Sequence, residues 1–369
     1  MKILILLRIL WTAGAQRIAI NEYKTLKELG HEVKIVFLRN SKTKGYEELL
    51  KGVDYTVIRN GSGLLTPFFF LATKLFAPDR GSESVVDLDL IRMVPKIVKK
   101  EGADYLICHD QWAGLGCYYA KRELGIPYSV FIHEKLSNYN IPILGKLANN
   151  LEKDALYNAD KVLAVTEKVA NSVKEKYSLN VEVNYPGMEL LDCEPLSRRE
   201  NIILSVSFWD SGRKPELYLN IAERFEKYKL VLAGNWRISS LKQDIINEIK
   251  RRGLTDRVFL RDNLKESELA ELYRKSKFFL RFGFGEYGLA TGVIEALGHC
   301  LPVIINDQLG TAYMVRENNI GKVLSNIDAD EIKAFVENMK ENEYTELQSN
   351  IREVILKYSW ESHVKKLLP

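Results

Sequence analysis

The densest group of residues suited to ligand chemistry lies in the stretch FFLRFGFGEYGLATGVIEALGHCLPVI. A glycine-rich turn that follows a buried strand can wrap backbone N–H groups around phosphate oxygens. Glu286 lies in this turn and Glu295 in the helix expected after it, and a carboxylate can accept two hydrogen bonds from the vicinal diol of a ribose or hexose. The stretch predicts a site for a compound that carries phosphates and sugars, with a flexible loop and a capping glutamate as the alternative. Its closely spaced glycines are Gly283, Gly285, Gly288 and Gly292.

Two other loops carry groups suited to anions. Arg213 and Lys214 follow the apolar run NIILSVSF, where an ammonium beside the amides of a helix N-terminus would suit a diphosphate. The same pair could also be two exposed basic residues without a ligand. Gly14, in WTAGAQR, lets the backbone approach a ligand at the start of the first helix, although the dinucleotide fingerprint GxGxxG is absent from that loop.

Two histidines end apolar runs. His109, followed by Asp110, ends ADYLICH, and His133, followed by Glu134, ends PYSVFIH. Ligands of parallel α/β sheets gather at the carboxyl ends of strands, so this placement favours a binding role. A pair of hydrogen-bonded core histidines is the alternative that stays open. No third ligand has suitable spacing to either histidine, so no metal site is expected.

Strands and helices must position these candidate residues. Short apolar runs such as KILILLRIL and EVKIVFL alternate with amphipathic stretches such as RIAINEYKTLKELG through both halves of the chain. Runs with little apolar–polar alternation suit strands buried on both faces of a parallel sheet, and strand–helix repetition gives an α/β doubly wound fold. The clearest linker, near 184–201, carries Pro186, Gly187 and Pro195. We therefore predict one Rossmann-like domain before it and another after it, followed by an amphipathic helix in YSWESHVKKLLP.

Composition agrees with a folded protein of two domains. The chain has 369 residues, which suggests two domains at roughly 150 residues each. Its net charge is only +4, from 53 Lys and Arg against 49 Asp and Glu, so nucleic acid is not an expected partner. The four cysteines contain no CxxC pair, which argues against a disulfide scaffold or zinc site and fits a reducing cytosol. They are Cys108, Cys117, Cys193 and Cys300.

Two apolar segments raise the question of membrane contact. The N-terminal MKILILLRILW is interpreted as a first strand rather than a signal peptide, because Arg8 breaks the apolar run. Residues 62–77, SGLLTPFFFLATKLFA, are shorter than the about 18 apolar residues of a spanning helix. They could lie in a membrane interface with Lys74 and Arg80 facing lipid phosphates, or pack on the sheet as a core helix or loop.

In these stretches the chain resembles the retaining glycosyltransferases of the GT-B fold, family 4 (glycosyl transferases group 1). The resemblance runs in order through TAGAQRIAINEYKTLKELGHEVKIV, CHDQWAGLG, FIHE, ADKVLAVTEKVANSVKEKY, NIILSVSFWDSGRKPE and the glycine-rich stretch. It implies two Rossmann-like domains facing across a cleft that closes on the donor. It further implies an acceptor-side domain at 1–188, a donor-binding domain at 189–350 and a C-terminal helix at 351–369 that crosses back to the first domain.

The resemblance also implies roles for individual residues. His133 would contact the transferred sugar, Glu286 would bind that sugar, and Lys214 would neutralise the leaving diphosphate. Glu295 would bind the nucleotide ribose, and His109 and Asp110 would lie on the acceptor side. The donor-binding set comprises Gly14, Arg213, Lys214, Glu286, Tyr287, Gly288, Leu289 and Glu295.

The implied activity is transfer of a hexose from a nucleotide-diphosphate sugar, most often a UDP- or GDP-sugar, to a glycan or polyprenyl-linked glycan. Configuration would be retained, and no cofactor or essential metal would be needed. The expected location is cytoplasmic, with peripheral contact to the inner face of the cell membrane through residues 62–77. Three alternatives stay open: a catalytically weakened homologue that acts as a sugar-nucleotide-binding partner subunit, a sugar-nucleotide epimerase, and a two-lobed sugar-binding protein.

Three positions depart from the family pattern. Eight residues separate Glu286 from Glu295, where the family usually has seven. Phe208 stands where the family commonly has an arginine, so Arg213 or Arg281 would have to supply that charge. The opening loop has Ala13–Gly14 in place of two glycines. We therefore expect the fold to hold and the donor site to differ in detail.

Overall fold

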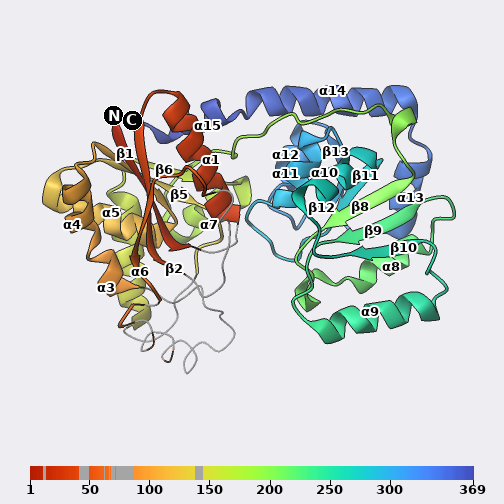
Figure 1. Ribbon diagram of the computed structural model, residues 1–369, viewed down its shortest axis with the longest axis horizontal. Helices are drawn as coiled ribbons and strands as arrows, with labels where there is room; N and C mark the ends of the chain where they lie inside the picture. The colour runs from red at the N-terminus through yellow and green to blue at the C-terminus, as the bar shows by residue number, and fades with distance from the viewer. Residues whose placement is uncertain are drawn as a thin grey trace. The chain divides into compact units, whose positions relative to one another are not determined.

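The computed structural model describes residues 1–10, 14–40, 50–61, 63–65, 67, 71, 87–137 and 144–369. The chain forms two compact units. The first unit contains Met1–Gly187 together with Trp360–Pro369, and the second contains Met188–Ser359. Each unit has one parallel sheet flanked by helices, so both are Rossmann-like α/β units, in agreement with the predicted fold class (Figure 1).

The sheet of the first unit has the strand order β3-β2-β1-β4-β5-β6-β7. Its central strands are continuous apolar runs, because a parallel sheet is covered on both faces. In β1, for example, Ile3, Leu4 and Ile5 have no exposed surface. The segment discussed as a possible signal peptide is thus an inner strand of this sheet. The strands are β1 (Lys2–Leu10), β2 (Glu32–Asn40), β3 (Tyr55–Arg59), β4 (Tyr105–His109), β5 (Tyr128–Ile132), β6 (Lys161–Ala164) and β7 (Glu182–Val183).

The helices of the first unit include one from the far end of the sequence. Helix α15 (Trp360–Leu367) packs against α1 (Gly14–Glu28), and the Tyr105 hydroxyl of β4 donates a hydrogen bond to the carbonyl oxygen of Leu367 at 3.0 Å. The two chain ends therefore lie side by side on this unit (Figure 1). The other helices given by the described residues of this unit are α3 (Leu88–Ile91), α4 (Val94–Glu101), α5 (Gln111–Leu124), α6 (Leu144–Tyr157) and α7 (Glu167–Tyr177).

The second unit carries a parallel sheet of order β10-β9-β8-β11-β12-β13. Aromatic residues fill its core, among them Trp209, Tyr218 and Phe282, which are all fully buried. Its strands are β8 (Ile202–Val206), β9 (Lys229–Ala233), β10 (Val258–Arg261), β11 (Phe278–Arg281), β12 (Val303–Asn306) and β13 (Gly321–Leu324). Its helices are α8 (Glu216–Ala222), α9 (Ser239–Arg251), α10 (Glu266–Lys275), α11 (Thr291–Gly298), α12 (Ala312–Glu317), α13 (Ala329–Glu337) and α14 (Glu341–Lys357).

The C-terminal stretch differs from the single segment expected at 351–369. Helix α14 belongs to the second unit and ends at Lys357, and α15 begins three residues later in the first unit. The predicted crossing of the C-terminal helix to the first unit is therefore made by α15 alone. The two helices are separated at Tyr358 and Ser359, although the backbone N–H of Tyr358 still donates a hydrogen bond to the carbonyl oxygen of Val354.

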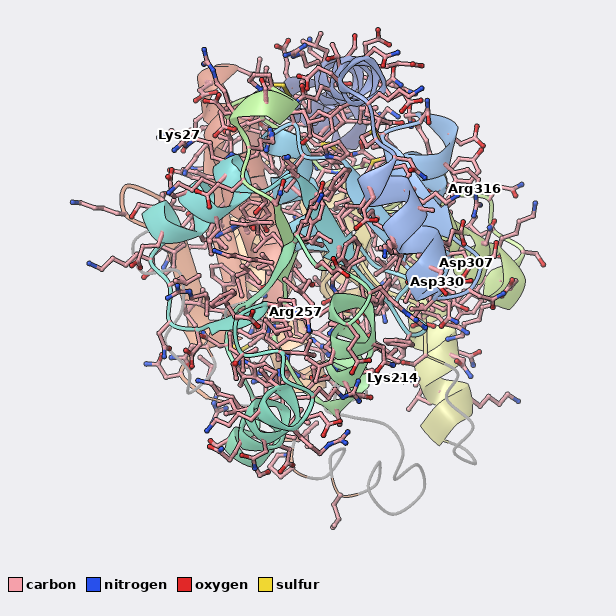
Figure 2. All side chains as sticks on the ribbon, turned by 90° about the vertical axis from the view of Figure 1, so that its right-hand side faces the viewer. Lys27, Lys214, Arg257, Asp307, Arg316 and Asp330 are labelled. Atoms are coloured by element: carbon pink, nitrogen blue, oxygen red, sulfur yellow. A yellow bond between two sulfur atoms is a disulfide. The ribbon has the colours of Figure 1, made fainter. Side chains whose placement is uncertain are left out.

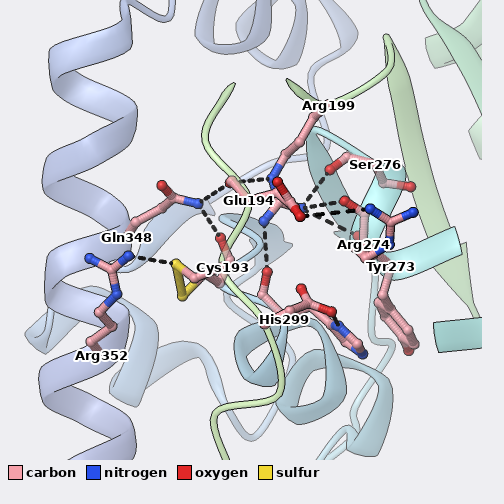
Figure 3. The surroundings of a disulfide bond; sticks show 11 residues. Cys193, Glu194, Arg199, Tyr273, Arg274, Ser276, His299, Gln348 and Arg352 are labelled. Carbon is pink, nitrogen blue, oxygen red and sulfur yellow. Dashed lines mark hydrogen bonds and ion pairs between the residues drawn. A yellow bond between two sulfur atoms is a disulfide. The ribbon is translucent and has the colours of Figure 1, made fainter. Parts of the chain in front are cut away.

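The segment that enters the second unit is fixed by a buried arginine. Arg199 is only 4% exposed, and its guanidinium donates to backbone carbonyl oxygens of Glu194, Ser276 and His299 at 2.9, 2.9 and 2.7 Å (Figure 3). Carbonyl groups satisfy a buried guanidinium without a counter-charge, because it offers five donors in a fixed fork. One side chain thus ties the entering segment to the ends of α10 and α11.

The cysteines correct an expectation from the sequence. All four are paired, Cys108 with Cys117 and Cys193 with Cys300. The first disulfide joins β4 to α5, and the second joins the entering segment to the turn after α11 (Figure 3). A search for CxxC spacing could not find them, because each bridge joins two elements that meet only in the folded unit. The cysteine pattern therefore no longer supports a reducing compartment.

Residues 62–77 lie mostly outside the described residues, so the interfacial interpretation stays a prediction. The described part includes Leu64, Leu65 and Leu71, which are 72%, 46% and 57% exposed. Within the described parts of the chain, every helix is too short or too polar to cross a bilayer.

Candidate functional site

Each sheet has one point where the strand order reverses direction. In the second unit this point lies between β8 and β11, and in the first unit between β1 and β4. At such a point the loops that follow the two strands diverge and leave a crevice outside the carboxyl ends, where α/β proteins bind ligands. Gly14, His109, Arg213 and Glu286 lie at or after the ends of these four strands, and His133 follows the neighbouring strand β5.

In the second unit, Glu286 is held by two arginines. The Arg281 Nη2 atom lies 3.1 Å from both carboxylate oxygens of Glu286, and Arg213 Nη1 contacts Oε1 of the same group. Arg213 follows β8 and Arg281 ends β11, so the cluster bridges the two strands at the reversal point. Phe208 is 47% exposed, and the replacement of its missing charge by Arg213 or Arg281 stays a prediction.

The cluster keeps a positive charge near neutral pH. Burial, with repulsion from Arg281, lowers the pKa of Arg213 to about 10, which still leaves it protonated at pH 7. Burial also lowers the pKa of Arg281, which is 4% exposed. Arg213, Arg281 and the adjacent Lys214 outnumber the carboxylates of Glu286 and Asp210, which leaves a net positive charge in a partly buried place. An anionic ligand is attracted more strongly there than at an open surface.

Lys214 adds a flexible cation beside this cluster. It projects from the loop immediately before α8, and its φ of 45° is in the left-handed region (Figure 2). Its Nζ atom lies 4.2 Å from the centre of the Phe284 ring, a cation–π distance. Because Phe284 belongs to the glycine-rich turn after β11, the two loops that flank the reversal point are in contact.

The glycine-rich turn is held by close backbone packing. The Asn306 side chain accepts the N–H of Gly283 and donates to its carbonyl oxygen, both at 2.8 Å. A Cβ atom at Gly310 would overlap the carbonyl oxygens of Tyr287 and Gly288. The backbone at Tyr287 and Gly288 therefore lies directly against the loop that follows β12, and Leu289 comes next in the same turn.

Glu295 lies on α11, one turn after the start of that helix. Its Oε2 atom accepts a hydrogen bond from the Tyr273 hydroxyl at 3.0 Å. The Tyr273 ring stacks on His299, with the rings 7° from parallel and their centres 5.3 Å apart. The backbone carbonyl oxygens of Tyr273 and His299 both accept hydrogen bonds from Arg199. Tyr273, which orients Glu295, is therefore held through its own backbone and through the ring on which it stacks.

In the first unit, the two predicted histidines contact each other. His109 Nδ1 lies 2.8 Å from His133 Nε2, and His109 Nε2 lies 2.7 Å from Glu22 Oε2. The other oxygen of Glu22 lies 2.8 Å from His363 Nε2 on α15. His109, Glu22 and His363 are buried, whereas His133 is half-buried at the end of the chain of contacts.

Burial and charge act in opposite directions on this chain. Burial alone would raise the pKa of Glu22, but its contacts with His109 and His363 hold it well below its ordinary value. Burial lowers the pKa of His133 well below its ordinary value. Glu22 is therefore ionised and His133 neutral near pH 7.

The hydrogen bonds of Asp110 stabilise the start of a helix. It is the N-cap of α5, and its Oδ1 atom accepts the N–H groups of Trp112 and Ala113 at 2.7 and 2.9 Å. Its φ of 75° lies in the left-handed region, which a non-glycine residue adopts at a cost. Its acceptor-side role stays a prediction, as does the phosphate role of Gly14, which the structure places at the first residue of α1.

The structure thus brings together Arg213, Lys214 and Glu286 in one unit and His109 with His133 in the other. Sequence reasoning missed Glu22 and His363. Glu22 carried a signal, because it falls on the apolar stripe of α1, four positions after Ile18 and four before Leu26. Tyr273 and His363 carried none, since each acts through a tertiary contact.

Comparison with known proteins covers nearly the whole chain. Residues 12–190 match the family described as Glycosyltransferase Family 4, and residues 194–357 match the family described as Glycosyl transferases group 1. No curated protein matches the sequence. The matches to solved structures cover almost all of both chains, at low sequence identity.

HepE of Anabaena in complex with UDP matches with a TM-score of 0.76 at 14% identity, over 99% of this chain and 98% of that one. HepE with UDP-glucose gives 0.73 at 15% identity, over 99% and 98%. A glycosyltransferase from Rickettsia africae gives 0.74 at 17% identity, over 99% and 96%. At such identities the structural likeness shows the fold alone, and the two family matches carry the assignment.

Proposed function

Because the chain belongs to the GT-B glycosyltransferases of family 4 and group 1, we propose that it moves a hexose from a nucleotide-diphosphate sugar to a glycan or lipid-linked glycan, with retention of configuration. The observation that carries the proposal is the cluster of Arg213, Arg281 and Glu286 at the strand-order reversal of the second unit. A diphosphate needs cations, and a sugar needs a fixed hydrogen-bond acceptor. This cluster supplies both.

The leaving diphosphate gains negative charge as its bond to the sugar breaks. Arg213, Arg281 and Lys214 are already in place to stabilise that charge, and preorganised charge of this kind is commonly the largest contribution to catalysis. We propose that these side chains do this work without a metal ion. The acceptor hydroxyl would attack from the face that the diphosphate leaves, and a phosphate oxygen would take its proton, which yields retention.

The sugars of the donor have separate partners in the proposal. Glu295, oriented by Tyr273, accepts hydrogen bonds from the ribose diol. Glu286, fixed by its two arginines, accepts from hydroxyls of the transferred hexose. His133 of the first unit contacts the same hexose. The UDP and UDP-glucose complexes of HepE support a UDP-sugar as the first donor to test.

The test is donor binding by calorimetry, together with release of nucleoside diphosphate, over UDP-, GDP- and ADP-sugars. One donor should bind saturably in the wild type, and Glu295→Gln should weaken that binding about tenfold or more, as expected for a lost charged hydrogen bond. Glu346→Gln, on α14, is the matched control, because it removes one exposed carboxylate of the same unit and should leave binding unchanged. Undiminished binding in Glu295→Gln would contradict the site.

A second candidate is a partner subunit that binds a nucleotide-sugar without turning it over. The engagement of Glu286 with two guanidinium groups favours it, because a carboxylate so occupied has fewer lone pairs left for a sugar. Tight donor binding with no transfer or hydrolysis across a broad acceptor panel would select this candidate. Measurable transfer to any glycan acceptor would select the enzyme.

A further inference from the structure

The contacts that begin at His133 form one continuous chain through the first unit. His133 follows β5, His109 ends β4, Glu22 lies on α1 and His363 lies on α15, so four elements contribute one residue each. The successive distances are 2.8, 2.7 and 2.8 Å. The inner end continues to the backbone, where His363 Nδ1 lies 3.0 Å from the carbonyl oxygen of Tyr185.

The hydrogen-bond partners along this series of four side chains determine which ring nitrogens carry protons. A backbone carbonyl can only accept, so His363 Nδ1 must carry a proton. The ionised carboxylate of Glu22 can also only accept, so His363 Nε2 must carry one as well. His363 is therefore an imidazolium whose counter-ion is Glu22. A buried ion pair of this kind is tolerated because each remaining polar atom has a partner.

The same rule then fixes the two outer rings. The carboxylate of Glu22 can only accept, so His109 carries its proton on Nε2. Because His363 already supplies the positive charge of the ion pair, His109 is neutral, and its Nδ1 atom is a hydrogen-bond acceptor. His133 Nε2 must then be the donor to His109. A neutral His133 has one proton, so its Nδ1 atom is left without one.

We propose that Glu22 and His363 are positioning residues that set the tautomer of His133, so that His133 Nδ1 meets the substrate as a hydrogen-bond acceptor. The inference rests on the proposed function, because it takes His133 to contact the transferred hexose. An acceptor nitrogen selects a sugar hydroxyl that can donate. The other tautomer would present an N–H group and select an acceptor oxygen instead.

The surroundings of His133 are consistent with this state. The titratable groups that face it are His109, Glu22 and His363 on three packed elements, and burial holds the pKa of its ring well below the ordinary value, so that the ring is neutral at pH 7. On its own loop, Glu134 and Lys135 follow with exposed side chains. A neutral ring with one fixed proton is what an orienting hydrogen-bond partner requires.

Nitrogen NMR of the full chain, labelled with 15N-histidine, tests the assignment without any activity. At neutral pH, His363 should show both ring nitrogens protonated, whereas His109 and His133 should each show a proton on Nε2 alone. Single substitutions His109→Gln, His133→Gln and His363→Gln assign the signals. A proton on His133 Nδ1, or a neutral His363 in the wild type, would overturn the inference.

Substitutions at Glu22 test the consequence for turnover. Glu22→Leu removes the acceptor, frees the tautomer of His109 and should lower kcat about tenfold with little change in donor KM, the size expected for one misdirected hydrogen bond. Glu22→Gln can accept from His109 and donate to His363, so it should recover most of that loss while His363 becomes neutral by NMR. Equal losses of kcat in both variants would overturn the positioning role.

Glu152→Leu is the matched control. Glu152 is equally buried in the same unit, and its partners Lys176 and Tyr177 are not members of the series His133, His109, Glu22 and His363. It should lower stability as Glu22→Leu does and leave kcat unchanged. The two proposals fail separately: the predicted NMR signals without donor turnover would contradict the proposed function alone, and turnover with other NMR signals would contradict this inference alone.

Discussion

At the scale of single residues, the two glutamates of the glycine-rich stretch differ in ways that their spacing does not reveal. Glu286 is bound to guanidinium groups, which hold its charge and its orientation. Glu295 is bound to a phenol hydroxyl, which orients one oxygen and adds no charge. The first arrangement suits a site that carries an anion nearby, and the second suits recognition of a neutral diol.

The role of Tyr273 can be tested by removing one oxygen atom. Tyr273→Phe should keep the stack on His299 and lose the hydrogen bond to Glu295 Oε2, so the carboxylate is less well oriented. Donor KM should rise about tenfold, since a hydrogen bond to a charged group contributes about 1.5–3 kcal/mol. Steady-state kinetics with the best donor measures this change.

Tyr344→Phe serves as the control for that substitution. Tyr344 is fully buried in the same unit, and its hydroxyl donates to the backbone carbonyl oxygen of Lys277 at 2.7 Å. Its loss should lower the melting temperature by a similar amount and leave donor KM unchanged. If Tyr344→Phe raises KM as much as Tyr273→Phe, the effect is one of stability.

The sequence singled out candidate residues at strand ends in each unit and missed the residues that contact them. Glu286, Lys214, His109 and His133 follow apolar runs, and a strand end is a position that periodicity can locate. Tyr273 lies 22 positions from Glu295 on a different helix, so no local pattern joins them. Glu22 was visible as a carboxylate on an apolar stripe, yet its histidine partners depend on how α1 meets β4 and α15.

At the scale of elements, the second unit positions its ligand groups through loops that lock into one another. The turn after β11 is bonded to Asn306 at the end of β12 and packed on Gly310 in the next loop. Strand positions were predictable from apolar runs, because burial on both faces leaves a strong signal. The contacts between these loops were not predictable, because they are made by backbone atoms whose positions leave no pattern in the sequence.

Gly310 offers a test of this interlocking. Gly310→Ala places a methyl group where the carbonyl oxygens of Tyr287 and Gly288 lie, so the glycine-rich turn must move. We expect a stability loss of about 1–3 kcal/mol, typical of overpacking, and donor affinity reduced by more than tenfold. Calorimetric titration with the best donor measures the affinity.

Gly253→Ala is the matched control, because Gly253 has a φ of +65° and open space at its Cβ position, in the turn between α9 and β10. That substitution should cost about 1 kcal/mol from backbone strain alone and leave donor affinity unchanged. Donor affinity that survives in Gly310→Ala would show that the turn can bind a donor in another conformation.

At the scale of the whole molecule, the two units differ in continuity. The second unit is one uninterrupted segment, whereas the first is completed by α15 from the C-terminus. The buried residues Val364 and Leu367 and the ion pair of His363 with Glu22 make α15 part of the core rather than an appendage.

Ending the chain after Ser359 should therefore affect the two units unequally. The first unit loses two buried aliphatic side chains and leaves Glu22 buried with one partner fewer, a cost on the order of 5 kcal/mol or more. Hydrogen exchange by mass spectrometry should show lost protection in α1, β4 and β5, with protection in β8–β13 unchanged. Equal loss in both sheets would contradict the division, and full protection in both would show that α15 is dispensable.

The discontinuous first unit has a consequence for the order in which the protein is made. The described strands of its sheet leave the ribosome before any part of the second sheet, yet α15 leaves it only after the whole second unit. The first unit therefore waits with Glu22 uncovered while the second unit is made. The portion made first is the portion completed last, and in that interval it is exposed to chaperones and proteases.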